Sequence, residues 1–444
     1  MLTNRFMAPL LVFLLAALPL VWMRIMASDW GNMAYFHIGA LALMVCVAAD
    51  PRARSGVFEA AGKTRHIWIA VALLFLVTLF SFLKVDPPFP ASDLVRQGFY
   101  ALSALAAGGA ILALYHANQL RHLVWAAPAA IVTFLYFMYV SLIASGANPF
   151  RIISLAISSG NPDALIFPLF RSAFNGGTAA VAEVRANARH DVVFALLLAA
   201  LASGIGLVDA GRRARQIAKA AIATIVLVAI FTFSRSAWLA MFLMAALFLS
   251  ATTARTNKGI VIWALIGQVF AAAMVYLWAF TPVVSMLSTR LFASASYEGR
   301  SSSAAALLER ARDHLWTGVP DLVADDWAHN LFVDYLSAAG IAGGLVALFL
   351  ILATVAAIVR YWLIAVGSPQ TRVLHLLCAS FLVLPLVRFV TAPKGHPSMS
   401  SWVAIGFASA LMAVLARQLA VGRAARRPVA PRPDGGFVGA PVVS

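Results

Sequence analysis

The chain has 444 residues, of which 62% are hydrophobic and only 11% are charged, and this composition excludes a soluble globular domain. The formal net charge of +16 is compatible with nucleic-acid binding in principle. However, the basic residues are scattered over turns between apolar runs, where anionic lipid head groups account for them, so we exclude nucleic acid as a partner. The sequence therefore predicts an integral membrane protein in contact with membrane lipids.

Apolar runs long enough to cross a bilayer, ~20 residues each, follow one another along the chain. They predict an all-α, polytopic fold with about twelve transmembrane helices, at residues 7–24, 32–49, 67–84, 98–116, 124–144, 192–208, 217–233, 236–252, 260–283, 330–358, 373–391 and 402–421. The first is expected to be an uncleaved span, because no small-x-small cleavage site follows it. Residues 1–421 then form a single transmembrane domain, and the Pro-, Gly- and Arg-rich tail 422–444 is expected to be disordered.

Lys and Arg residues of the short loops favour one orientation of these spans. They concentrate on the side that also holds both termini, which the positive-inside rule identifies as cytoplasmic. The two long loops, 145–191 and 284–329, then lie on the outer side, and short helices are expected within them. Cys46 and Cys378 fall inside spans and are too few for a disulfide framework or a metal site.

The loop 145–191 contains apolar pieces that are too short to span, such as RIISLAIS and ALIFPLFRSAF. Such pieces are typical of interfacial or re-entrant segments, and the loop is expected to lie on the membrane as a lid. It ends with Arg189 and His190, which are placed at the outer mouth of the sixth span beside Asp191.

Arg235 is the single charge between Ala220 and Ala254. One helix over that stretch would be roughly 50 Å long, far thicker than a bilayer, so a tight hairpin is expected instead. Its tip holds Arg235 between Ser234 and Ser236, near the outer interface. The guanidinium can bind a ligand there, or it can snorkel to lipid head groups.

The second long loop contains a predicted helix from Ser301 to Leu315, ended by Gly318 and Pro320. Arg300 stands at its N-terminus, where helices favour anions. A negatively charged ligand shared between the free N–H groups and the guanidinium would explain this position, and an exposed, solvated arginine is the alternative.

His329 and Asn330 close this loop and start the next span. On a continuous helix Asp326 and Asp334 would reach them and fix a histidine tautomer, although a histidine at an interface is often structural. The hairpin RFVTAPKGHPSMSSW brings Arg388 and Lys394 to the same side.

Ionisable residues thus gather at one membrane face and are nearly absent from span centres. A proton-coupled transporter would need acidic or histidine relays near the midplane, so a transporter is disfavoured. An anionic, lipid-linked substrate fits better. The acidic turn with Asp321, Asp325 and Asp326 shows no tight ligand pattern, and no metal or other cofactor is expected.

Several motifs resemble those of a known family. FSRSAWLA, the Gly299-Arg300 pair, TGVP and above all HNLFVDYLSAAGIAGG are similar to the signature region of O-antigen ligases and their polymerase relatives, over about residues 220–360. One departure is Gly318-Val319-Pro320, where many relatives have Gly-x-Gly.

The resemblance implies a metal-independent, inverting glycosyltransferase of the periplasmic face of a bacterial inner membrane. It would move O-antigen glycan from undecaprenyl pyrophosphate to the core sugars of lipid A. His329, Arg235 and Arg300 match residues regarded as essential in the family, and a neutral histidine base with phosphate-binding guanidiniums suits this chemistry.

We therefore expect His329 to be the general base and Arg235 and Arg300 to bind the pyrophosphate. Further substrate contacts are expected from Arg189, His190, Asn330, Arg388 and Lys394. An O-antigen polymerase or a protein O-oligosaccharyltransferase would use the same donor with another acceptor. A lipid-linked glycan flippase would need a similar basic cavity without chemistry.

Overall fold

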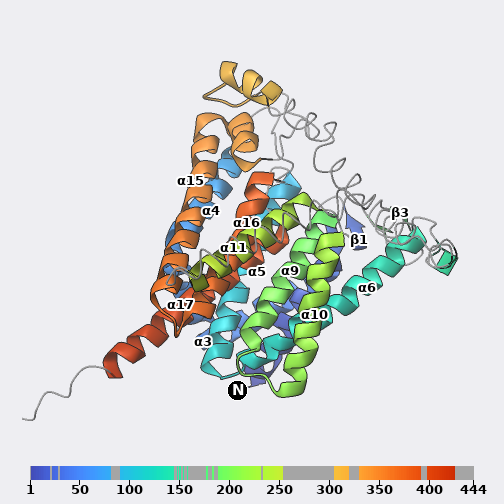
Figure 1. Cartoon of the computed structure of the whole chain (residues 1–444). Helices are drawn as coiled ribbons and strands as arrows, with labels where there is room; N and C mark the ends of the chain where they lie inside the picture. Colours follow the sequence, from blue (N-terminus) through green and yellow to red (C-terminus); the bar gives the residue numbers. More distant parts are fainter. Residues whose placement is uncertain are drawn as a thin grey trace, which may run out of the picture.

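The computed structural model describes most of the helical part of the chain (Figure 1). The described residues are 2–20, 23–28, 31–81, 91–144, 148, 150–151, 154, 158, 177–178, 183–184, 189–231, 234–253, 305–319, 330–391 and 398–425. For some of them, Arg189, His190 and Arg235 among them, only the backbone is described.

Every predicted span except 260–283, which lies outside the described residues, falls on a helix. These helices are α1 (Leu2–Ala17), α2 (Tyr35–Ala49), α4 (Arg65–Ser81), α5 (Ala91–His116), α6 (Ala126–Ala144), α9 (Arg189–Gly206), α10 (Arg212–Phe231), α11 (Arg235–Thr253), α15 (Leu331–Gly367), α16 (Arg372–Thr391) and α17 (Met399–Ala425). Within the described part, five helices are long and apolar enough to cross a membrane, or six if the bent pair of α2 and the helix after it counts as one. The helical membrane fold is confirmed, and the number twelve stays a prediction.

Successive helices run in alternate directions, so the bundle has two distinct ends. The start of α1 and the end of α17 lie together at the lower end in Figure 1, which we call the termini end. The starts of α9, α11 and α15 and the last turn of α16 lie at the opposite end, which we call the site end. α17 runs through the middle of the bundle, and residues 399–415 are all buried.

Two elements were not predicted. The first is α3 (Pro51–Lys63), which turns 105° away from α2. The Asp50 carboxylate caps α3 by accepting hydrogen bonds from the backbone N–H groups of Arg52 (2.8 Å) and Ala53 (3.3 Å), and Pro51 is pre-organised for the first turn. Hydropathy misses α3 because it buries only a narrow stripe of small residues, Ala53, Gly56 and Ala60, against α5 and α17.

The second is a small antiparallel sheet with the strand order β2-β1-β4-β3. Its strands are β1 (Met23–Ser28), β2 (Gly31–Ala34), β3 (Gly177–Thr178) and β4 (Glu183–Val184). β1 pairs with β4 through Met23↔Val184 and Arg24↔Glu183. The sheet therefore ties the segment after α1 to the end of the loop 145–191, and the first predicted span ends earlier than expected because Met23 and Arg24 belong to a strand.

The long helix α15 is interrupted at Gly340, whose φ of 67° and ψ of −160° are not helical. The segment 305–319 docks at this break. Its residues 305–313 are helical, inside the range predicted for this loop helix, and it forms two main-chain hydrogen bonds with α15: Ile341 N–H to Leu315 O (2.6 Å) and Val319 N–H to Ser337 O (2.7 Å). Backbone groups that the break releases thus find partners, as buried backbone groups require.

Replacing Gly340 with alanine is expected to destabilise the protein by about 2 kcal/mol or more, because this backbone conformation is accessible almost only to glycine. A Cβ atom would also lie 2.5 Å from Leu315 O. Thermal unfolding of the purified protein in detergent measures the effect. Gly62→Ala is the control, since nothing lies within 4 Å of its Cβ position. Equal unfolding temperatures of the two variants would contradict this account of the break.

Candidate functional site

The site end brings together helix ends that are far apart in sequence. Asn330 at the start of α15 donates a hydrogen bond from Nδ2 to Val390 O at the end of α16 (3.4 Å). Asp191 in the first turn of α9 pairs with Arg388 of α16. α11 also packs along α16, and the hydrogen bond from Trp362 Nε1 to Ser250 Oγ fixes its far end at the termini end, so α11 starts at the site end.

Arg388 is the central charged group among the described residues of this region. Its side chain is buried, with the residue only 7% exposed, and its Nη2 lies 2.5 Å from Asp191 Oδ1. The guanidinium also lies over the ring of Phe194, 5.3 Å from the centroid. Two further nitrogens, Nε and Nη1, are buried without an acceptor in the described part of the chain. Buried donors of this kind are costly, so the arrangement favours an additional anionic or carbonyl acceptor.

Asn330 has a structural role that the sequence analysis did not predict. Its φ of −135° and ψ of 123° are extended, and its Oδ1 accepts hydrogen bonds from Phe332 N–H (3.0 Å) and Val333 N–H (3.4 Å). It is therefore the N-cap of α15, and the helix begins at Leu331. Asp334, four residues on, is fully buried in the first turn.

The stretch around Arg235 forms the break between α10 and α11. Ser234 lies before α11, where its hydroxyl accepts a hydrogen bond from Ala237 N–H (3.4 Å) and lies 3.2 Å from that of Ser236. Trp238 Nε1 donates to Ile230 O (3.1 Å) and so links the two helices across the turn. The expected interruption of the helix is present between Phe231 and Arg235, and the backbone of Arg235 opens α11. That the two helices form a tight hairpin across the bilayer stays a prediction.

A polar network beside this region was missed by the sequence analysis. Tyr335 on α15 lies 3.1 Å from Thr78 Oγ1 on α4 and accepts a hydrogen bond from Gln97 Nε2 on α5 (3.0 Å). All three side chains are buried. The available signal was polar residues within apolar runs, which mark helix contacts in membranes.

The remaining predicted site residues divide into two groups. Arg189 and His190 form the first turn of α9 beside Asp191, with only their backbone described. Arg300, His329 and Lys394 lie outside the described residues, as do Asp321, Asp325 and Asp326 of the acidic turn. Among the residues that the structure describes, no group of three His, Cys, Asp or Glu side chains is arranged to hold a metal ion.

Arg388→Met is expected to destabilise the protein by about 3 kcal/mol, because it removes the ion-pair partner of a largely buried carboxylate. The double variant Asp191→Asn/Arg388→Met should recover much of the loss. Thermal unfolding in detergent gives the comparison, with the exposed Arg54→Met as control. The role of the pair is refuted if Arg388→Met unfolds at the wild-type temperature.

In comparisons with known proteins, no family model matches the chain, and no curated protein matches it either.

Proposed function

We propose that this protein is a membrane glycosyltransferase of the O-antigen ligase type. It has about twelve spans, both termini in the cytoplasm and its site end facing the periplasm of a bacterial inner membrane. Its donor is a glycan on undecaprenyl pyrophosphate, and its acceptor is the core oligosaccharide of lipid A. It uses no cofactor.

The observation that carries the proposal is the buried guanidinium of Arg388 at the junction of α9, α15 and α16. This cation retains N–H groups without acceptors among the described residues, and it lies where the start of α15 meets the end of α16. A pyrophosphate offers the anionic oxygens that such a group prefers. Arg235 and Arg300 bind the same pyrophosphate in the proposed complex, with contributions from Arg189, His190 and Lys394.

The remaining step is activation of the acceptor hydroxyl. His329 directly precedes Asn330, the N-cap of α15, so its backbone is one residue from an anchored helix start. As general base it takes the hydroxyl proton while the hydroxyl oxygen bonds to the anomeric carbon of the donor. The bond from that carbon to the pyrophosphate breaks, the arginines bind the released charge, and direct attack inverts the configuration.

His329→Ala is expected to lower glycan transfer by about 100-fold or more, the range of general-base catalysis. The measurement is transfer from a defined polyprenyl-pyrophosphate donor to lipid A core by the purified protein. His122→Ala, an exposed histidine at the termini end, is the control. Wild-type transfer by His329→Ala would refute the base assignment.

The same assay with three acceptors tests the acceptor class. Transfer to lipid A core supports a ligase, transfer to a second lipid-linked repeat supports a polymerase, and transfer to protein serines supports an oligosaccharyltransferase. Movement of the donor across a vesicle without any new bond would identify a flippase.

Arg235→Ala and Arg300→Ala are each expected to reduce use of the donor by about 10- to 100-fold, because each removes a charge-assisted, planar contact to phosphate. Lysine at either position should restore part of the activity. The donor dependence of the transfer rate reports the effect, with Arg54→Ala as control. Equal, small effects of alanine at all three positions would show that the two arginines only contact lipid head groups.

A further inference from the structure

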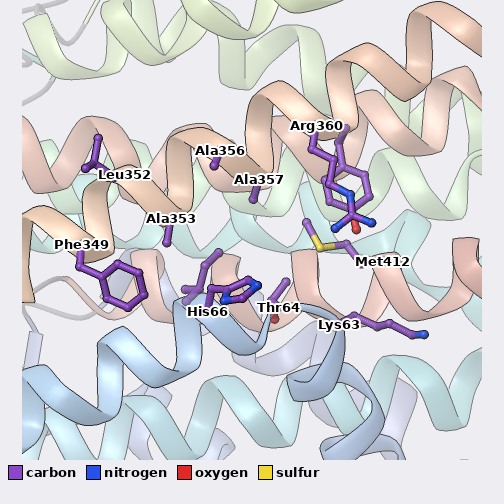
Figure 2. Close-up of a pocket in the computed structure, with 12 residues that line it drawn as sticks. Lys63, Thr64, His66, Phe349, Leu352, Ala353, Ala356, Ala357, Arg360 and Met412 are labelled. Carbon is purple, nitrogen blue, oxygen red and sulfur yellow. The ribbon is translucent and has the colours of Figure 1, made fainter.

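A hollow lies between α4 and α15, toward the termini end of the bundle. It has a volume of about 360 Å³, and α3, α4, α15 and α17 contribute its lining. Figure 2 shows its two unlike parts: Phe349 and Ala353 toward one end, Arg360 and Lys63 toward the other, and His66 between them. No carboxylate is among the described residues that line it.

The basic part of the hollow is exposed. Lys63, His66 and Arg360 are all exposed. The nearest acid along α3, Glu59, lies one turn before Lys63 and is paired with Arg417 of α17 through both of its carboxylate oxygens. Glu59 is thus bonded to Arg417 and attracts Lys63 only through space. Since the described lining of the hollow contains basic side chains and no acidic one, its net charge is positive.

The apolar part can hold a length of acyl chain. From Phe349 to Ala357 the wall follows α15 for roughly 12 Å at 1.5 Å per residue, less than half of the ~30 Å hydrocarbon thickness. Small side chains, Ala353, Ala356 and Ala357, make the wall hollow, and Leu352 at its edge is 55% exposed. The cations stand at the end of the wall nearer the termini end.

We propose that this hollow binds an anionic glycerophospholipid of the leaflet at the termini end. One acyl chain lies along Phe349, Ala353 and Ala356, and the phosphate lies among Lys63, His66 and Arg360. The glycan donor is a different ligand, because Asn330 and Arg360 lie near opposite ends of α15. The inference is thus independent of the proposed transferase activity.

Native mass spectrometry of the full-length protein tests this site, with phosphatidylglycerol and phosphatidylcholine added in detergent. Phosphatidylglycerol should bind more tightly, and Lys63→Ala/Arg360→Ala should weaken it by on the order of tenfold. Arg212→Ala/Arg213→Ala removes the same charge at exposed positions of α10 and should have no effect. Equal binding to both double variants, or equal binding of the two lipids, would overturn the proposal.

A second pair of variants tests the acyl chain. Ala356→Phe fills the hollow and should weaken binding of phosphatidylglycerol, whereas Val355→Phe, on an exposed neighbouring position outside the lining, should not. Glycerol phosphate at millimolar concentration should fail to displace the lipid. Displacement by glycerol phosphate, or undiminished binding to Ala356→Phe, would reveal a phosphate site without a lipid chain and would refute the lipid assignment.

Discussion

Backbone N–H and C=O groups that are buried away from water need hydrogen-bond partners, and this constraint shapes α15. The helix breaks at Gly340, and the segment 305–319 supplies the partners that the break demands through Leu315 O and Val319 N–H. The same two bonds fix the direction of the turns before the break and hold the loop segment against them. The segment 305–319 and the helix start at Asn330 are in this way parts of one packed unit.

Buried charged side chains, like buried backbone groups, need partners. The Arg388–Asp191 pair lies at helix ends and is largely buried, and the ring of Phe194 adds a further favourable contact for the cation. The basic cluster at Lys63 and Arg360 instead faces outward, where head groups can neutralise it. One end of the bundle thus retains a buried cation suited to a specific anion, while the other presents cations to the lipid.

Hydropathy was sufficient to locate the apolar runs, and the interruption of the helix at Ser234 followed from comparing helix length with bilayer thickness. The same method missed α3, because a stripe of Ala53, Gly56 and Ala60 carries almost no hydrophobic signal. At the site, Arg388 was predicted but its partner was not, since 197 residues separate it from Asp191. The cap formed by Asn330 depends on where α15 starts, and hydropathy locates a helix start only within a few residues.

The two parts of α15 are held by different side chains. Before Gly340, Tyr335 is bonded to Thr78 of α4 and Gln97 of α5. After it, Trp362 bonds to Ser250 of α11, and Phe349, Ala353 and Arg360 form part of the wall of the hollow. Because Gly340 interrupts the helical hydrogen bonding between these parts, a small shift of the wall at Ala356 need not be transmitted to Asn330. The proposed lipid site and the proposed catalytic site can therefore be altered independently, because they are built on the two parts of one interrupted helix.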